Sequence, residues 1–124
     1  MAKTSYKELI IWQRAMEIVV EVYHLTKRLP KEEQYMLVNQ LRRAAVSIPS
    51  NIAEGYTRHT TKDYIHFLNL SLGSNSEVET QLEICRRLEY LDNTDKADRL
   101  CDEVGKMLNT IIQKPSLHKQ PPNP

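Results

Sequence analysis

The chain has 124 residues, enough for one domain with a buried core and too few for two comfortable ones. Lysine plus arginine number 17 and aspartate plus glutamate 16, so the chain lacks the strong positive charge typical of a dedicated nucleic-acid binder. Two cysteines, no basic start followed by an apolar run, and no apolar stretch near the ~18 residues of a membrane span predict a cytoplasmic protein.

The first predicted helix starts just before Leu9 and ends at Leu29-Pro30. Ser5 and Glu8 have the S-x-x-E spacing of a capping box. Two neighbouring apolar stripes make the apolar arc unusually broad, so we expect this helix to pack against more than its own bundle. The stripes consist of Leu9, Trp12, Met16, Val19 and Tyr23, and of Ile11, Ala15, Ile18, Val22 and Leu25.

The second predicted helix runs from about Lys31 to Glu54. Its apolar stripe continues past Pro49, which predicts a kink there, with the freed Ala45 carbonyl accepting from Ser47, Ser50 or water. Gly55 is expected to end the helix in the left-handed conformation. A polar stripe on the same helix faces either solvent or another subunit, and consists of Gln40, Arg43, Ser47, Ser50, Asn51 and Glu54.

The third predicted helix is capped by Thr60 and runs to about Tyr90, although its middle, residues 69–76, contains poor helix formers. A turn at residues 92–94 leads to the fourth helix, whose apolar stripe runs from Ala97 to Ile112. Residues 114–124 contain four prolines and are expected to be disordered.

Four helices joined by short turns predict an all-α, antiparallel up-down-up-down four-helix bundle over residues 1–113. Counting from each turn places Trp12 level with Ile48 and Arg43 level with Gly73, where a glycine would leave room opposite a guanidinium. Arg42 or Arg43 could then reach Glu77 or Glu79 in a structural ion pair, and the alternative is that they contact a ligand directly. The predicted polar layer or oligomer contact consists of Arg42, Arg43, Ser47, Ser50, Asn51, Glu77 and Glu79.

The common enzyme and cofactor motifs do not occur in the sequence, which predicts a non-enzymatic protein without a metal or cofactor. Glu21-x-x-His24 and Asp63-x-x-His66 resemble halves of a di-metal site, but the predicted topology places them at opposite ends of the bundle. Cys85 and Cys101 are expected to be buried, reduced thiols.

Basic residues collect at the end of the predicted bundle that holds the N-terminus, the turn between the second and third helices, and the C-terminus. This end is either an ordinary solvated surface or a contact for phosphates, and a ring of subunits would multiply its charge. The candidate phosphate contacts are Lys3, Lys7, Arg58, His59 and Lys62.

Residues 41–55 read LRRAAVSIPSNIAEG and resemble the signature of a bacterial four-helix-bundle family, first recognised as proteins encoded in intervening sequences of 23S ribosomal RNA genes. Residues 68–91, with 72–74 and 77–82 among them, resemble the family's second block, and Trp12 with Ala15 its opening helix, so the similarity covers about residues 6–113. The resemblance implies a cytoplasmic homo-oligomer, most simply a pentameric ring. It also implies a distant similarity to the accessory variability protein of diversity-generating retroelements, which binds nucleic acid and a reverse transcriptase.

Two hypotheses for function follow. In the first, the protein is an oligomer that binds structured RNA or DNA through the basic end, using charge and shape rather than base sequence. In the second, it is a scaffold without nucleic-acid binding, in which the polar stripe of the second helix and the broad apolar face of the first serve assembly and a protein partner.

Overall fold

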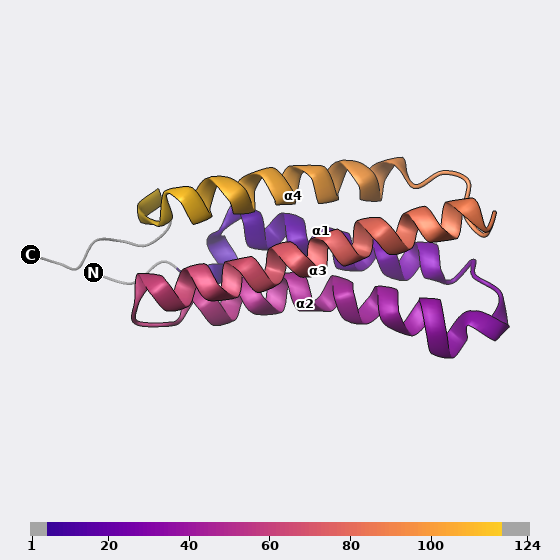
Figure 1. Ribbon diagram of the computed structural model, residues 1–124, viewed down its shortest axis with the longest axis horizontal. Helices are drawn as coiled ribbons and strands as arrows, with labels where there is room; N and C mark the ends of the chain where they lie inside the picture. Colours follow the sequence, from indigo (N-terminus) through magenta and orange to yellow (C-terminus); the bar gives the residue numbers. More distant parts are fainter. Residues whose placement is uncertain (1–4, 118–124) are drawn as a thin grey trace, which may run out of the picture.

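The computed structural model describes residues 5–117, and these form an antiparallel bundle of four long helices without a β-strand. The helices are α1 (Ile10–Thr26), α2 (Asn39–Tyr56), α3 (Thr61–Arg87) and α4 (Asp95–Gln113), and they run side by side along the long axis (Figure 1). Each helix packs against its neighbours in sequence, and α1 also packs against α4, which closes the bundle. The predicted fold class is confirmed.

At its two ends the chain includes residues that the sequence predicts to bind phosphates or to be disordered. Lys3 and residues 118–124 lie outside the described part of the structure. Pro115–Leu117, the first part of the predicted disordered tail, form a short 3₁₀ turn, η4, that contacts α3 and α4.

The start of α1 differs from the capping-box prediction. Tyr6–Glu8 form a separate 3₁₀ turn, η1, and the Ser5 hydroxyl accepts a hydrogen bond from the Lys7 amide at 3.2 Å. Leu9 is then extended and only 8% exposed, and α1 begins at Ile10. Ser5 therefore caps the preceding turn, because burying Leu9 in the core interrupts the helix.

The stretch that leads into α2 is not a regular α-helix. It begins with a 3₁₀ turn, η2 (Lys31–Glu33), followed by a π-helical turn, η3 (Gln34–Val38). From there α2 continues through Pro49 without interruption, and a kink at this residue stays a prediction. The Ser50 hydroxyl donates to the Val46 carbonyl at 2.8 Å rather than to the carbonyl of Ala45.

Gly55 does not end α2, so the prediction of a left-handed terminal glycine is wrong. It lies inside the helix, and no glycine of the described chain has a positive φ. A Cβ at this position would lie 2.8 Å from Cβ of Phe67 and 3.2 Å from the carbonyl oxygen of Tyr64. Gly55 is therefore present because α2 and α3 approach each other closely here, not because the chain turns.

The weak helix formers in the middle of α3 link this helix to its neighbours. The α3 cap is as predicted, since the Thr60 hydroxyl accepts from the Asp63 amide at 3.1 Å. The Ser71 hydroxyl donates to the Ile48 carbonyl at 2.9 Å, and the Asn75 side-chain amide donates to the Cys101 carbonyl at 2.9 Å. Serine and asparagine lower the helix propensity of this segment, but their buried side chains form hydrogen bonds between helices that hold the bundle together.

The helix stripes predicted to be buried form the core. On α1 the stripe of Ile11, Ala15, Ile18, Val22 and Leu25 is buried, and so are Leu41, Ala44, Ala45, Ile48 and Ile52 of α2. In the second apolar stripe of α1, Leu9 is buried and Trp12 and Val19 pack against the core, whereas Met16 and Tyr23 are each 38% exposed. No helix within residues 5–117 combines the length and apolar character needed to cross a membrane.

Candidate functional sites

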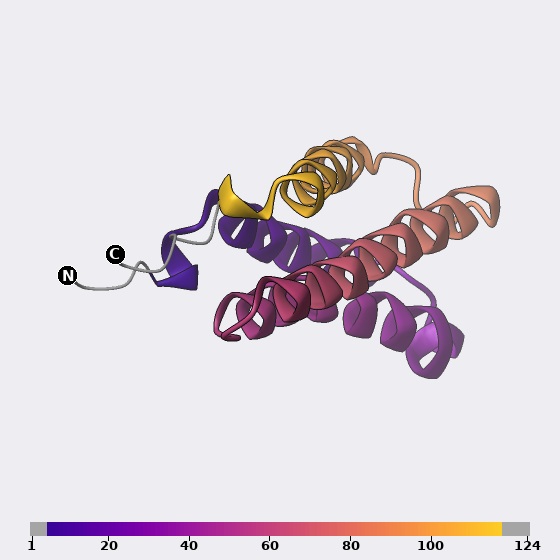
Figure 2. The same cartoon turned by 60° about the vertical axis from the view of Figure 1, so that its left-hand side comes forward.

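The predicted basic end exists in the structure. Turn η1, the turn between α2 and α3, and the last described turn of the chain lie at the same end of the bundle (Figure 2). Lys7, His59 and Lys62 are all exposed there. Within the described residues neither lysine takes part in an ion pair, so both ammonium groups are available to a ligand.

Arg58 is less available than the sequence suggested. Its guanidinium forms an ion pair with Glu54 at 2.8 Å and lies over the ring of Phe67, 4.8 Å from its centroid. The described part of this end holds four basic residues against three acidic ones, so its excess of positive charge is small. They are Lys7, Arg58, Lys62 and Lys114, against Glu8, Glu54 and Asp63.

The predicted polar layer is present in part and has different members. The Asn51 amide donates to the carbonyl and the hydroxyl of Ser47, both at 2.9 Å, and the Ser74 hydroxyl lies 2.9 Å from the same Ser47 hydroxyl. Ser47 is therefore level with Ser74, whereas the predicted register placed it level with Asn69, so the α2–α3 register differs from the predicted one by about five residues.

The predicted ion pairs across α2 and α3 are wrong. In the described chain neither Arg42 nor Arg43 pairs with Glu77 or Glu79. A Cβ on Gly73 would meet nothing within 4 Å, so this glycine does not make room for a guanidinium either.

Glu79 belongs to the α3–α4 side of the bundle. Its side chain is exposed, but partial desolvation against α4, together with the negative charges of Asp102 and Asp98, raises the pKa of this carboxyl group. Glu77 is exposed. Neither carboxylate neutralises the arginines of α2.

Arg42 points instead toward α1. Its Nε donates to the Thr26 hydroxyl at 2.9 Å, and its guanidinium carbon lies 4.4 Å from the centroid of the Tyr23 ring. Arg42 and Tyr23 are part of an open groove of about 560 Å³ between α1 and the start of α2. The groove is lined by Tyr23, Gln34, Tyr35, Val38, Asn39, Arg42, Arg43, Val46 and Ser47.

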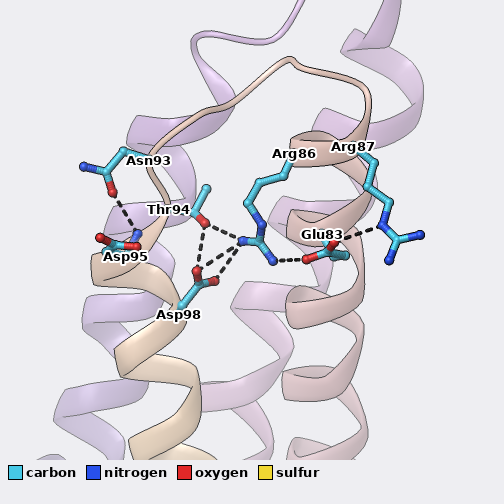
Figure 3. Close-up of polar contacts among 7 residues, drawn as sticks. All are labelled: Glu83, Arg86, Arg87, Asn93, Thr94, Asp95 and Asp98. Carbon is cyan, nitrogen blue, oxygen red and sulfur yellow. Dashed lines mark hydrogen bonds and ion pairs between the residues drawn. The ribbon is translucent and has the colours of Figure 1, made fainter.

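The other polar cluster lies at the turn between α3 and α4 (Figure 3). Arg86 donates to both carboxylate oxygens of Asp98, at 3.1 and 3.2 Å, and also to Glu83 and to the Thr94 hydroxyl. The Thr94 hydroxyl in turn lies 2.9 Å from Asp98. Because every charged group in this cluster has an opposite partner, its role is to fix the turn rather than to bind a ligand.

Both cysteines are buried free thiols, as predicted. Burial raises the pKa of Cys85, and it raises the pKa of Cys101 to about 12. A thiol that keeps its proton at neutral pH is a poor nucleophile and a poor metal ligand. Within residues 5–117 no group of three or more histidine, cysteine, aspartate or glutamate residues is placed to hold a metal ion.

Comparison with known proteins identifies the family. The family model described as 23S rRNA-intervening sequence protein matches residues 7–110. This chain belongs to that family. A crystal structure of a protein of unknown function from the S23 ribosomal protein family of Bacteroides thetaiotaomicron is similar, with a TM-score of 0.78 and 27% sequence identity. The alignment covers 85% of this chain and all of that one. A comparison with curated protein sequences gave no significant match.

Sequence reasoning found the basic end and missed the groove. The family signature includes Arg42, Arg43 and Ser47, which line the groove, but Tyr23 and Tyr35 come from other segments. The spacing of Tyr35, Asn39, Arg42 and Val46 is that of one face of a helix, and this is the sequence signal that could have pointed to the groove.

Proposed function

We propose that this protein is a non-enzymatic, cytoplasmic homo-oligomer that binds structured RNA or DNA through the basic end of the bundle. The observation that supports the proposal is that η1, which carries the exposed Lys7, lies at the same end of the bundle as the α2–α3 turn and the start of α3, which carry the exposed His59 and Lys62. Ammonium groups without carboxylate partners attract phosphates and release counterions when they bind them. The small charge excess of one subunit predicts weak, salt-sensitive binding without sequence preference.

Assembly would supply what one subunit lacks. A pentameric ring, as the family resemblance implies, would place five copies of the basic end on one face. Binding to several phosphates at once raises the effective affinity without any new contact within a subunit.

The test measures fluorescence anisotropy of a labelled RNA hairpin at low and physiological salt. We expect Lys7→Glu with Lys62→Glu to weaken binding at least tenfold. The slope of log affinity against log salt concentration should also become shallower, by the contribution of about two phosphate contacts per subunit. Lys27→Glu with Lys96→Glu is the matched control, because it makes the same charge change at exposed positions of the opposite end. Equal losses in both double variants would mean that only net charge matters, and no loss in the first would rule out the basic end.

A scaffold without nucleic-acid binding is the second candidate. It is favoured by the exposed apolar side chains of α1, which include Ile10 at 59% and Val20 at 56% exposure. In this reading the α1 surface serves assembly and a protein partner, and the variants at Lys7 and Lys62 would leave partner binding unchanged.

A further inference from the structure

The α1–α2 groove combines positive charge with exposed aromatic surface. Arg42 and Arg43 line it, and no aspartate or glutamate is among the residues found to line it in the described chain. Tyr35, at the edge of the groove, is 87% exposed, although a tyrosine of a folded helix normally buries most of its ring. The groove therefore matches a ligand that carries both negative charge and a flat face.

Arg42 is already held in position for such a ligand. The Thr26 hydroxyl occupies its Nε, and the Tyr23 ring supports one face of the guanidinium. Its two terminal nitrogens make no hydrogen bond or ion pair with the described residues. A guanidinium ordered through Nε, with both terminal nitrogens available, can bind the oxygens of a phosphate in a bidentate way at little entropic cost.

The π-helical turn carries Tyr35, the most exposed aromatic residue of the groove. Residues Gln34–Val38 form this turn, which buries Val38 and leaves Tyr35 and Met36 at the surface. Single π-helical turns are frequent at functional sites. Tyr35 lies two helical turns before Arg42 on the same face, so the ring and the guanidinium lie along one open groove rather than in an enclosed pocket.

We propose that this groove binds a short run of unpaired nucleotides, with phosphate oxygens at Arg42 and Arg43 and a base stacked on Tyr35. Only an unpaired base exposes a face to a side chain, and stacking on aromatic rings is the usual way in which proteins hold one. Gln34, Asn39 and Ser47 add polar groups that can contact base edges or sugars. An acidic peptide would satisfy the two arginines and leave the exposed Tyr35 ring without a role.

The inference rests on the nucleic-acid binding proposed above and assigns it a second contact. The groove and the basic end lie at opposite ends of α2, about 30 Å apart along the helix. One subunit would then contact the paired stem of a nucleic acid at the basic end and its single-stranded flank in the groove.

The experiment compares two labelled RNAs, a blunt hairpin and the same hairpin with a single-stranded uridine extension, by anisotropy with the full-length protein. We expect the extension to improve the affinity of the unaltered protein. Tyr35→Ala should reduce the gain in affinity from the extension about tenfold, as expected for the loss of one stacked base. Arg43→Gln should also reduce this gain. Neither variant should change the affinity for the blunt hairpin. Tyr35→Phe keeps the ring, and Arg99→Gln removes an exposed arginine from α4, so both controls should bind like the unaltered protein.

The outcomes separate this inference from the proposed function. If the extension gives no gain while Lys7→Glu with Lys62→Glu still abolishes hairpin binding, the groove assignment is wrong and the basic end stands. If neither RNA binds, both proposals fail. Capture of a polyglutamate peptide in a manner that depends on Arg43 would then assign the groove to an acidic protein segment. A changed oligomer mass in the Tyr35→Ala or Arg43→Gln protein, without a change in RNA affinity, would make the groove a subunit contact and overturn the inference.

Discussion

Asn75 and Cys101 show how single side chains connect α3 to α4. The Asn75 amide donates to the Cys101 carbonyl, while its own oxygen is buried without a partner among the described residues. Gly105 lies opposite, where a Cβ would come within 3.3 Å of the Asn75 nitrogen. The Cys101 thiol is fully buried next to this contact. Its environment favours the neutral form, because burial and the nearby carboxylates of Glu79 and Asp98 oppose a thiolate.

The raised pKa of Cys101 predicts a loss of stability at alkaline pH. The folded protein keeps the thiol proton up to about pH 12, whereas the unfolded chain releases it near the ordinary value of 9.0. Above pH 9 the unfolded state therefore binds fewer protons, and the free energy of unfolding falls as the pH rises. We expect urea unfolding between pH 8 and 10 to show this decline, with a shallower slope in Cys101→Ala.

The slope rather than the absolute stability is the readout, since the alanine also leaves a cavity. Measurements stop at pH 10 because the pKa of Tyr64 is raised as well, by burial, and would add its own loss at higher pH. Identical slopes for the two proteins would show that Cys101 does not carry the effect.

At the scale of the elements, two glycines in helices have opposite surroundings. Gly55 lies where α2 touches α3, against Tyr64 and Phe67, whereas Gly73 lies on the outer face of α3 with open space around it. Neither has a positive φ, so neither is required by the conformation of the backbone. The two glycines differ only in the space that is available for an added side chain.

We therefore expect opposite effects from the same substitution. Gly55→Ala should destabilise the protein by about 1–3 kcal/mol, because the bundle must open to admit the methyl group. Gly73→Ala should stabilise it by about 0.5–1 kcal/mol through helix propensity alone. Chemical denaturation of both variants measures the two values. A stable Gly55→Ala protein would contradict the close-approach explanation, and a destabilised Gly73→Ala protein would indicate that a second copy packs on this face of α3.

At the scale of the whole molecule, the exposed large apolar side chains of the described residues lie on α1, on η3 and α2, and on or just after α3, whereas α4 carries none. The exposed apolar residues of α1 are Ile10, Met16, Val20 and Tyr23, on the helix whose remaining stripe fills the core. A single subunit leaves this surface in water at a cost that assembly would remove.

We expect Val20→Glu to lower the mass of the assembly, measured by light scattering, without loss of helical circular dichroism. A charge at this position would have to be desolvated in a subunit contact, whereas it is free in a monomer. Ile84→Glu, at a comparably exposed site on α3, is the control and should keep the mass of the unaltered protein. The α1 surface is not the contact if Val20→Glu assembles normally.

The sequence by itself determined the helices and their order, because the period of apolar residues and the turn residues are local signals. It placed the α2 stripe in the core and Thr60 at a helix cap, and it brought Lys7, His59 and Lys62 to one end through topology alone. The family signature added membership through a pattern that covers most of the chain.

Only the tertiary structure decided which side chains meet across helices. A shift of about five residues in the α2–α3 register replaced the expected ion pairs with contacts of Ser47 and Ser74, and the packing of α1 against α2 made a groove that Tyr23, Tyr35 and Arg42 line together. Gly55 changed from a stop signal to a contact point for the same reason. Such contacts depend on the exact end of each helix and on the partner it faces, and neither is encoded in the local pattern of one segment.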